Sequence, residues 1–226
     1  MTLRARLFLR FWLGMPALGV VVFGPVGTLR FWQGWVYLAI MLVCGLFSIL
    51  YFYHRDPELL KRRLQSREQI KEQRLIMKLW SMLYCLTLVV AGLDYRFGWS
   101  WAWLAPVPLW LTVFSEAITL GGSLWVFWVM KVNSFAARTI QVEAGQSVVS
   151  NGPYRLVRHP MYLGIMVANL SLPLALGSFL ALPISALLIP LIVFRLLNEE
   201  KLLRADLPGY QEYCQSRPFR LVPYVW

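Results

Sequence analysis

Long apolar stretches, each about as long as a membrane crossing, follow one another along this 226-residue chain. A helix needs about 20 apolar residues to span the hydrocarbon of a bilayer. The stretches cover residues 7–29, 33–53, 75–93, 99–130, 161–176 and 179–196. Only 15% of the residues are charged, against roughly 25% in soluble domains. The sequence therefore predicts an all-α integral membrane protein with five to six transmembrane helices, the last two forming a hairpin, and it argues against a soluble enzyme, a disordered chain or a disulfide scaffold.

The first apolar stretch follows three arginines, Arg4, Arg6 and Arg10, a pattern also typical of a secretory signal peptide. No small-x-small cleavage site follows it, and further spans come after it. We therefore interpret it as an uncleaved first span.

Residues 54–74 are rich in charge and separate the second and third spans. Asp56 is a suitable N-cap and Pro57 a suitable first helical residue, which predicts a helix over about 57–73. Its leucines alternate with charged residues, as in an amphipathic helix on a membrane surface. The alternative is a solvated charged loop.

Proline and glycine predict breaks within the later spans. Pro106 and Pro108 indicate a short lead-in before the fourth span, and Gly177-Ser178 indicates a tight break inside the hairpin. Kinks are expected at Pro173, Pro183 and Pro190, and each arm of the hairpin is slightly short for a full crossing.

The net charge of +11 is distributed unevenly about the predicted spans. With six crossings, 20 of the 22 Lys and Arg residues fall on the side of both termini, and only Arg30 and Arg96 fall on the other. Cytoplasmic loops carry such an excess, so both termini are expected in the cytoplasm. The basic residues then reflect membrane topology and contact with anionic lipid, and no nucleic-acid partner is expected.

Specific-looking polar residues are concentrated after residue 130. We therefore divide the chain into residues 1–130, which hold the first helices and the basic segment, and residues 131–226, which hold a cytoplasmic segment, the hairpin and a tail. Three cysteines (Cys44, Cys85, Cys214) lie far apart without a CxxC pair, so neither a metal site nor a disulfide framework is predicted. The chain contains no GxGxxG, P-loop, HExxH or GxSxG motif.

The run from Asn151 to Gly164 combines two arginines, a histidine and two tyrosines with Gly-Pro and His-Pro pairs. Pro160 is expected to open a helix whose first N–H groups point to the cytoplasmic side, and such a helix start favours an anion. We interpret the run as a polar pocket at the membrane surface. The alternative is a basic membrane anchor with interfacial tyrosines.

A second candidate is Arg195 with Glu199 and Glu200 at the end of the last apolar stretch. Arg195 and Glu199 share one helix face, and no charge occurs in the 17 residues before Arg195. A charge so close to hydrocarbon is costly, which favours a functional role over a surface ion pair. Glu116, an acid inside a predicted span, is a further functional hypothesis without a named partner.

Three motifs and the tail together resemble the isoprenylcysteine carboxyl methyltransferase family, within the broader group of membrane phospholipid methyltransferases. The motifs are Gly152-Pro153-Tyr154, Arg158-His159-Pro160-Met161-Tyr162-Leu163-Gly164 and Arg195 with Asn198-Glu199-Glu200, and the tail contributes Tyr210, Tyr213, Arg217, Pro218, Arg220 and Pro223. The resemblance covers about residues 130–226. Two features differ from the eukaryotic members: the acidic run is short, with only Glu199-Glu200, and the chain has fewer spans. These differences concern the identity of the substrate more than that of the cofactor.

The resemblance implies an S-adenosylmethionine-dependent membrane methyltransferase that acts on a lipophilic or prenylated acceptor. The cofactor contacts that it implies are Gln141, Gln146, Ser147, Val148, Val149, Tyr154, His159, Pro160, Met161, Tyr162 and Glu199. It assigns Arg195 to the substrate side as the catalytic residue, with Asn133, Arg217 and Arg220 as further substrate contacts, and it implies no metal.

Three alternatives remain open from the sequence. Within the same class, the acceptor is a phospholipid amine or a small thiol. An NADPH-dependent reductase of the sterol-reductase type has a similar C-terminal region, but the short segment 131–160 leaves little room for a second phosphate-bearing group. A transporter or scaffold gives no reason for His159, Arg195 and Glu199 to converge, and no inverted repeat is visible.

Overall fold

The computed structural model describes residues 2–64, 70–136, 142 and 145–226 of the chain. Within these residues every regular element is a helix, as predicted. The elements are α1 (Leu3–Val26), α2 (Trp32–Arg55), α3 (Pro57–Leu64), α4 (Lys71–Phe97), α5 (Trp99–Trp103), α6 (Leu109–Val132), the 3₁₀ helix η1 (Gly152–Arg155), α7 (Pro160–Ala175), α8 (Leu182–Ala186), α9 (Leu188–Asp206) and α10 (Tyr210–Ser216).

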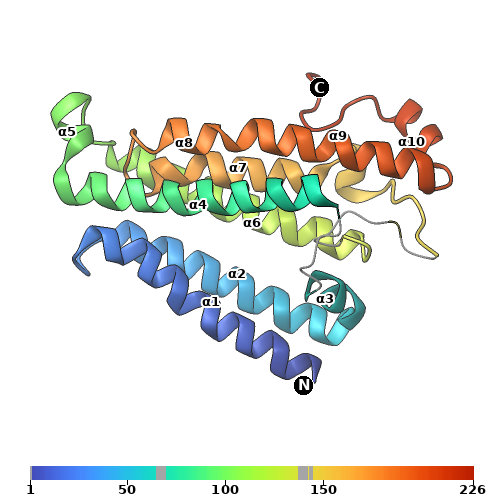
Figure 1. The fold of residues 1–226 in the computed structure, drawn as a ribbon, viewed down its shortest axis with the longest axis horizontal. Helices are drawn as coiled ribbons and strands as arrows, with labels where there is room; N and C mark the ends of the chain where they lie inside the picture. The colour runs from blue at the N-terminus through green and yellow to red at the C-terminus, as the bar shows by residue number, and fades with distance from the viewer. Residues whose placement is uncertain (1, 65–69, 137–141, 143–144) are drawn as a thin grey trace.

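Five stretches of the described chain are long and apolar enough to cross a membrane, which confirms the prediction of a multi-pass membrane protein. They are α1, α2, α4, α6 and the combined stretch Leu182–Asp206, whereas α7 is apolar but only 16 residues long. The long helices run along one axis, and both termini lie at the same end of the bundle (Figure 1). The opposite end holds α5 and the turn between α1 and α2.

Two boundaries differ from the sequence prediction. The helix expected over 57–73 is described as α3 up to Leu64, where Leu59 and Leu60 pack beside Phe52, and it is not continuous to residue 73, because Ile70 is extended. Residues from Lys71 onward instead begin α4. The last helix continues to Asp206, ten residues beyond the apolar stretch; in this extension Glu200 is buried against basic partners, whereas Lys201, Arg204 and Asp206 are exposed.

The predicted breaks are present. The chain between α5 and α6 contains both prolines of the expected lead-in, and Gly177 adopts a left-handed φ of 73° at the turn after α7. The interruption between α8 and α9 has a clear cause. Pro190 has no N–H to donate to the carbonyl of Ala186, so the regular hydrogen bonding lapses at Leu187.

Close contact between α6 and α7 sets the position of the start of α7. A Cβ on Gly122 would come within 2.9 Å of the Gly164 carbonyl oxygen and of Ala168 Cβ. Thr119 and Ser171 add a hydroxyl hydrogen bond of 2.9 Å across the same interface. Small residues allow two membrane helices to approach closely and to gain van der Waals contact where lipid supplies no hydrophobic drive.

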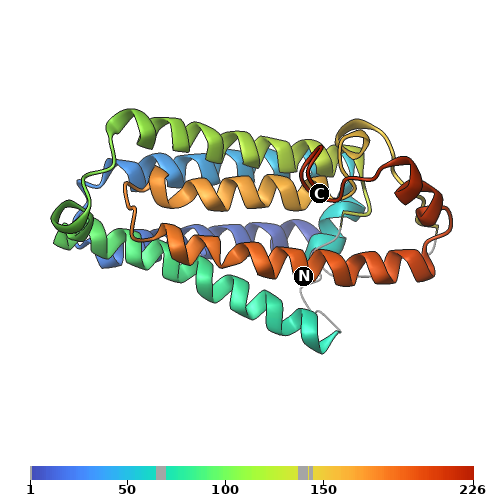
Figure 2. The ribbon, with the colours of Figure 1, turned by 90° about the horizontal axis from the view of Figure 1, so that it is seen from above.

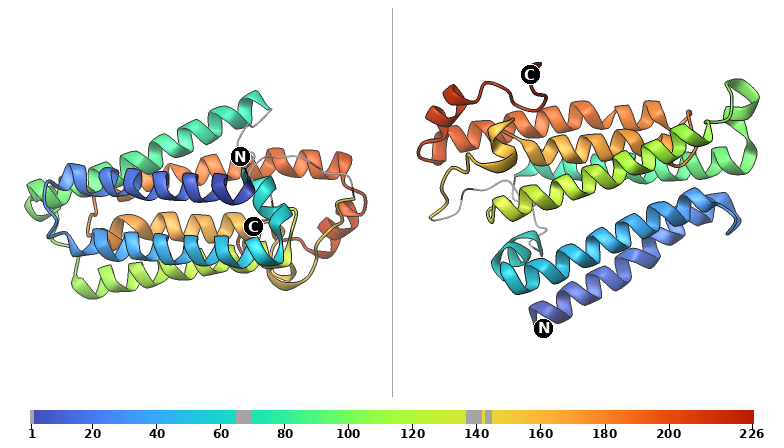
Figure 3. Two further views of the ribbon diagram at one scale, coloured as in Figure 1. Left: turned by 90° about the horizontal axis from the view of Figure 1, so that it is seen from below. Right: turned by 180° about the vertical axis from the view of Figure 1, so that it is seen from behind.

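A buried carboxylate joins the elements at the opposite end of the bundle. Asp94, near the end of α4, accepts hydrogen bonds from the backbone N–H and the hydroxyl of Ser100 and from the hydroxyl of Ser178. The first donor lies in α5 and the last in the turn after α7. Asp94 therefore ties α4, α5 and the hairpin turn together. The α5 segment lies at the end of the bundle away from both termini (Figure 3).

The α6–α7 contact predicts opposite outcomes for two neighbouring glycines. Gly122→Ala forces a methyl group against backbone, and overpacking of this kind costs about 1–3 kcal/mol. Gly121 has open space where its Cβ would be, so Gly121→Ala should preserve or raise stability through helix propensity. Thermal unfolding in detergent should show a lower midpoint for Gly122→Ala alone. Equal midpoints for the two variants would contradict the close packing.

Candidate functional site

A cavity of about 410 Å³ lies at the end of the bundle that holds both termini. Its walls come from segments that are far apart in sequence: the loop after α6, the approach to α7 with its first turns, and the second half of α9 with α10. Arg63 of α3 and the residues Met77, Trp80 and Ser81 of α4 complete it. The turned view shows that the beginning of α4 diverges from the other helices at this end (Figure 2).

Backbone hydrogen bonds position the residues just before α7. The N–H groups of Arg158 and His159 donate to the carbonyls of Phe219 and Arg220 in the C-terminal tail, at 3.0 and 2.9 Å. Pro160 then occupies the first helical position, where its missing N–H removes no helical hydrogen bond. The helix start therefore lies against the cavity, with His159 as its N-terminal flanking residue.

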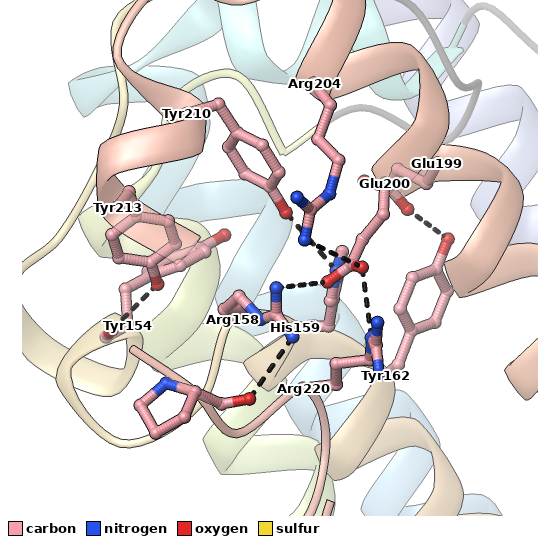
Figure 4. Close-up of polar contacts among 11 residues, drawn as sticks. Tyr154, Arg158, His159, Tyr162, Glu199, Glu200, Arg204, Tyr210, Tyr213 and Arg220 are labelled. Carbon is pink, nitrogen blue, oxygen red and sulfur yellow. Dashed lines mark hydrogen bonds and ion pairs between the residues drawn. The ribbon is translucent and has the colours of Figure 1, made fainter. Parts of the chain in front are cut away.

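The carboxylate of Glu200 is the centre of a buried ion cluster (Figure 4). Its oxygens lie 3.1 Å from Arg158 Nη1, 3.3 Å from His159 Nε2 and 3.0 Å from Arg220 Nε. Arg204 is a more distant fourth partner at 3.9 Å. The Glu200 side chain is only 4% exposed, so these cations replace the water that the carboxylate would otherwise need.

A second chain of hydrogen bonds runs along the cavity wall. Arg195 Nε donates to the Tyr162 hydroxyl at 3.0 Å, and this hydroxyl donates to Glu199 at 2.6 Å. The two charged residues predicted to share a helix face are thus linked by a phenol from α7. Arg195 is buried, yet it lines the cavity. Its guanidinium group can therefore meet a ligand within the cavity while its orientation is set by the protein.

Neutral tyrosines form another part of the wall. Asn133 donates to the Tyr154 hydroxyl at 2.7 Å, and Tyr213 donates to the Tyr154 carbonyl at 2.8 Å. Burial raises the pKa of Tyr154 to about 12, although the hydrogen bond from Asn133 acts in the opposite direction. Burial also raises the pKa of Tyr210 and of Tyr213. These phenols therefore stay protonated at physiological pH and offer aromatic surface without charge.

Most residues assigned from the resemblance line this one cavity. They are Asn133, Gln146, Ser147, Val148, Val149, Tyr154, His159, Pro160, Met161, Tyr162, Arg195 and Glu199. Gln141 lies outside the described residues. Arg217 and Arg220 lie in the tail beside the cavity: Arg220 binds Glu200, and Arg217 donates to the Ser216 carbonyl. Their contact with substrate, like the ligand roles of the other residues, remains a prediction.

Several residues of this region have no assigned role in the sequence prediction. Glu200 was quoted in a motif, but its partners come from the tail and from the approach to α7, and these become visible only in the fold. Arg63, Met77 and Trp80 belong to a segment that was interpreted as a surface helix and an ordinary span. A signal for Glu200 was available, because consecutive acids on a helix point in different directions and need different partners. In the described part of the chain, no group of three or more His, Cys, Asp or Glu side chains is arranged to hold a metal ion.

Residues 110–206 match the model of a family described as Phospholipid methyltransferase. The matched region begins in α6 and ends with α9, so it contains most of the cavity-lining residues named above but less than half of the chain. Together, fold and match define a multi-pass membrane protein that carries a region similar to this methyltransferase family.

Two relatives show more distant similarity. The chain is 35% identical over 91 residues to the delta(14)-sterol reductase TM7SF2 of Mus musculus, a match that covers 39% of this chain and 22% of the relative. It is 29% identical over 139 residues to the cobalt-zinc-cadmium resistance protein CzcN of Cupriavidus metallidurans, which covers 59% of this chain and 58% of the relative. The chain thus spans less than two thirds of either protein.

The cluster around Glu200 predicts that substitution of Glu200, but not of the adjacent Glu199, weakens the hydrogen bonds between the tail and the residues before α7. Glu200→Ala leaves Arg158 and His159 buried without their counter-charge, and breaking a buried ion pair costs about 3–5 kcal/mol. The amide hydrogens of Arg158 and His159, which bond to the tail, should then exchange much faster in a hydrogen-exchange experiment. Glu199→Ala, which removes a partner of Tyr162 only, should leave this protection intact. Equal loss in both variants would contradict the role of Glu200.

Proposed function

We propose that the protein is an S-adenosylmethionine-dependent integral membrane methyltransferase that O-methylates the carboxylate of a lipophilic, prenylcysteine-like acceptor. One observation carries the proposal: most of the residues that the resemblance assigns to cofactor and acceptor line a single cavity, although they come from segments between residues 133 and 199. The match of residues 110–206 to a methyltransferase family supports the same reaction class.

The cavity fits S-adenosylmethionine in size and in chemistry. Its volume of about 410 Å³ falls in the usual range for cofactor sites, roughly 300–1,000 Å³. The start of α7 with His159 suits the amino-acid carboxylate, and Glu199 suits the ammonium or the ribose hydroxyls. Tyr154 and Pro160 offer surface for the adenine. When bound, this group supplies a methyl already activated by its sulfonium.

Arg195 is the proposed catalytic residue because it can hold the acceptor carboxylate next to the donor. Methyl transfer to a carboxylate forms one C–O bond and breaks one C–S bond, and no proton has to be removed. The protein then contributes mainly alignment, for which a guanidinium with fixed orientation is suited. An amine acceptor would have to lose a proton, and the positive charge of Arg195 would not favour a cationic ammonium.

An apolar part of the cavity offers a place for the acceptor's hydrocarbon chain. Met77 and Trp80 of α4 and Ile165 of α7 line it, on the side where the beginning of α4 diverges from the bundle (Figure 2). This side faces the region that lipid would occupy around the helices. A lipid-borne acceptor can then present its head group to Arg195 while its chain stays in an apolar environment.

The proposal places the reaction at the cytoplasmic membrane face. The cavity and both termini share one end of the bundle, to which the positive-inside argument assigns 20 of the 22 basic residues. Residues 131–226 then form the methyltransferase core, with α3 and α4 completing one wall.

The second candidate is an NADPH-dependent reductase, favoured by the 35% identity to a sterol reductase over 91 residues. Such a cofactor is larger and carries several phosphates, which call for cationic partners. Arg158 and Arg220, two cations beside the cavity, are already paired with Glu200. This arrangement favours the smaller cofactor with a single carboxylate.

Cofactor binding is expected to be measurable directly. Isothermal titration of the detergent-purified protein with S-adenosylmethionine should give saturable heat that S-adenosylhomocysteine suppresses. His159→Ala and Glu199→Ala should each weaken binding about 10-fold or more, the usual effect of losing a hydrogen bond to a charged group. Folded protein that binds neither compound, but binds NADPH, would replace the proposal by the second candidate.

The acceptor class is tested with radiolabelled S-adenosylmethionine and a panel of N-acetyl-S-farnesylcysteine, phosphatidylethanolamine vesicles and an alkyl thiol. Label is expected on the farnesylcysteine as a base-labile methyl ester. Arg195→Ala should lower kcat/KM for this acceptor at least 100-fold while cofactor affinity changes little. Transfer to the amine or thiol instead, or loss of cofactor binding alone in Arg195→Ala, would overturn the proposed role of Arg195.

A further inference from the structure

Gln73, in the first turn of α4, makes a direct contact with the proposed catalytic arginine. Its Oε1 accepts a hydrogen bond from Arg195 Nη1 at 3.2 Å, and its side chain is fully buried, with 0% exposure. If the amide of Gln73 were flipped, its N–H group would face the N–H group of Arg195, and neither could accept a hydrogen bond. The amide oxygen must therefore face the guanidinium. Gln73 lies outside the region that matches the family model, because that match begins at residue 110.

Two printed hydrogen bonds help to set the orientation of the Arg195 guanidinium. Tyr162 of α7 holds Arg195 at Nε, and Gln73 of α4 holds it at Nη1. A guanidinium is planar, so two bonds to different nitrogens define its plane. Both of these partners are neutral, so neither adds a negative charge beside the guanidinium.

The cost of burying Gln73 indicates that its carbonyl oxygen is needed at this position. Its Nε2 is buried without a hydrogen-bond partner among the described residues. A buried amide with an unmet donor destabilises a protein, and an apolar side chain of similar size would pack here without that penalty. A role in packing alone would not favour glutamine.

We propose that Gln73 is a positioning residue that orients Arg195 for an anionic acceptor head group. The inference rests on the proposed function for its catalytic meaning, and it extends the site to the part of the chain outside the matched region. Because the neutral amide of Gln73 places no negative charge beside Arg195, the Gln73–Arg195 pair favours a carboxylate over an amine. A glutamate at the same position would still orient Arg195 but would oppose an anion.

The test compares Gln73→Leu and Gln73→Glu with the control Thr87→Val. Thr87 lies on the same helix, is equally buried at 1% exposure, and donates only to Leu83 within that helix. With N-acetyl-S-farnesylcysteine as the probe, Gln73→Leu should lower kcat/KM about tenfold, the usual scale for a hydrogen bond to a charged group. Cofactor affinity should stay within about twofold, and Thr87→Val should change neither quantity.

The two substitutions and a double variant separate positioning from a merely structural role. Gln73→Glu should restore kcat toward that of the parent protein while it raises KM for the anionic probe. In an Arg195→Lys background, Gln73→Leu should have no further effect, because its action passes through the guanidinium. Additive losses in the double variant, or equal losses of cofactor binding, would overturn the proposal.

A spectroscopic readout keeps the inference independent of turnover. In ¹⁵N-arginine-labelled protein in detergent, the Nη protons of Arg195, identified by their absence in Arg195→Lys, should exchange slowly with water. Gln73→Leu should speed this exchange, whereas Thr87→Val should not. If the parent protein fails to methylate the probe, the proposed function fails, and this signal still decides whether Gln73 orients Arg195. Unchanged exchange in Gln73→Leu would refute the inference.

Discussion

The carboxylate of Glu200 is the interaction on which the polar end of this protein depends. It draws Arg158 and His159, which precede α7, and Arg220 of the tail onto the side of α9. Without it, two arginines and a histidine would meet at this position with no acidic partner. Because Arg158 and His159 also bond to the tail through their backbone N–H groups, one acid determines both the electrostatics and the chain path beside the cavity.

The membrane explains why this chemistry is confined to one end. Hydrocarbon is a poor solvent for polar groups, and some polar side chains within the bundle bond to one another, as Thr119 and Ser171 do. At the end of the bundle, where α9 continues to Asp206, the buried carboxylate of Glu200 has basic partners. Arg195 of the same helix is buried and lines the cavity.

Much of the fold was predictable because a membrane requires long apolar helices, and such helices can be recognised directly in the sequence. The apolar stretches, the lead-in with Pro106 and Pro108 and the turn at Gly177 all appeared in the structure, since each reflects a local property of the chain. The limits of local reasoning appear in the basic segment. The local pattern predicted one helix over 57–73, whereas Ile70 is extended and a separate helix, α4, begins at Lys71.

Part of the candidate site was also predictable, but the reason was the resemblance of its motifs to a known family. His159, Tyr162 and Glu199 were assigned because they stand in sequence motifs that resemble those of a known family. All three line the cavity. No sequence pattern indicates the contacts of Gln73 with Arg195 or of Glu200 with its distant partners. These contacts join residues more than forty positions apart, or they join α9 to the tail. Long-range contacts of this kind are properties of the folded chain and not of any segment.

The pairing of the tail with the residues before α7 has a consequence for biosynthesis. The membrane-length helices that the structure describes precede residues 219 and 220, whose carbonyls hold Arg158 and His159 in place. During translation these helices can therefore insert while this part of the site is still open. The loop before α7 can take up its final path only after residues 219 and 220 have left the ribosome, so these helices enter the membrane before the cavity end is complete.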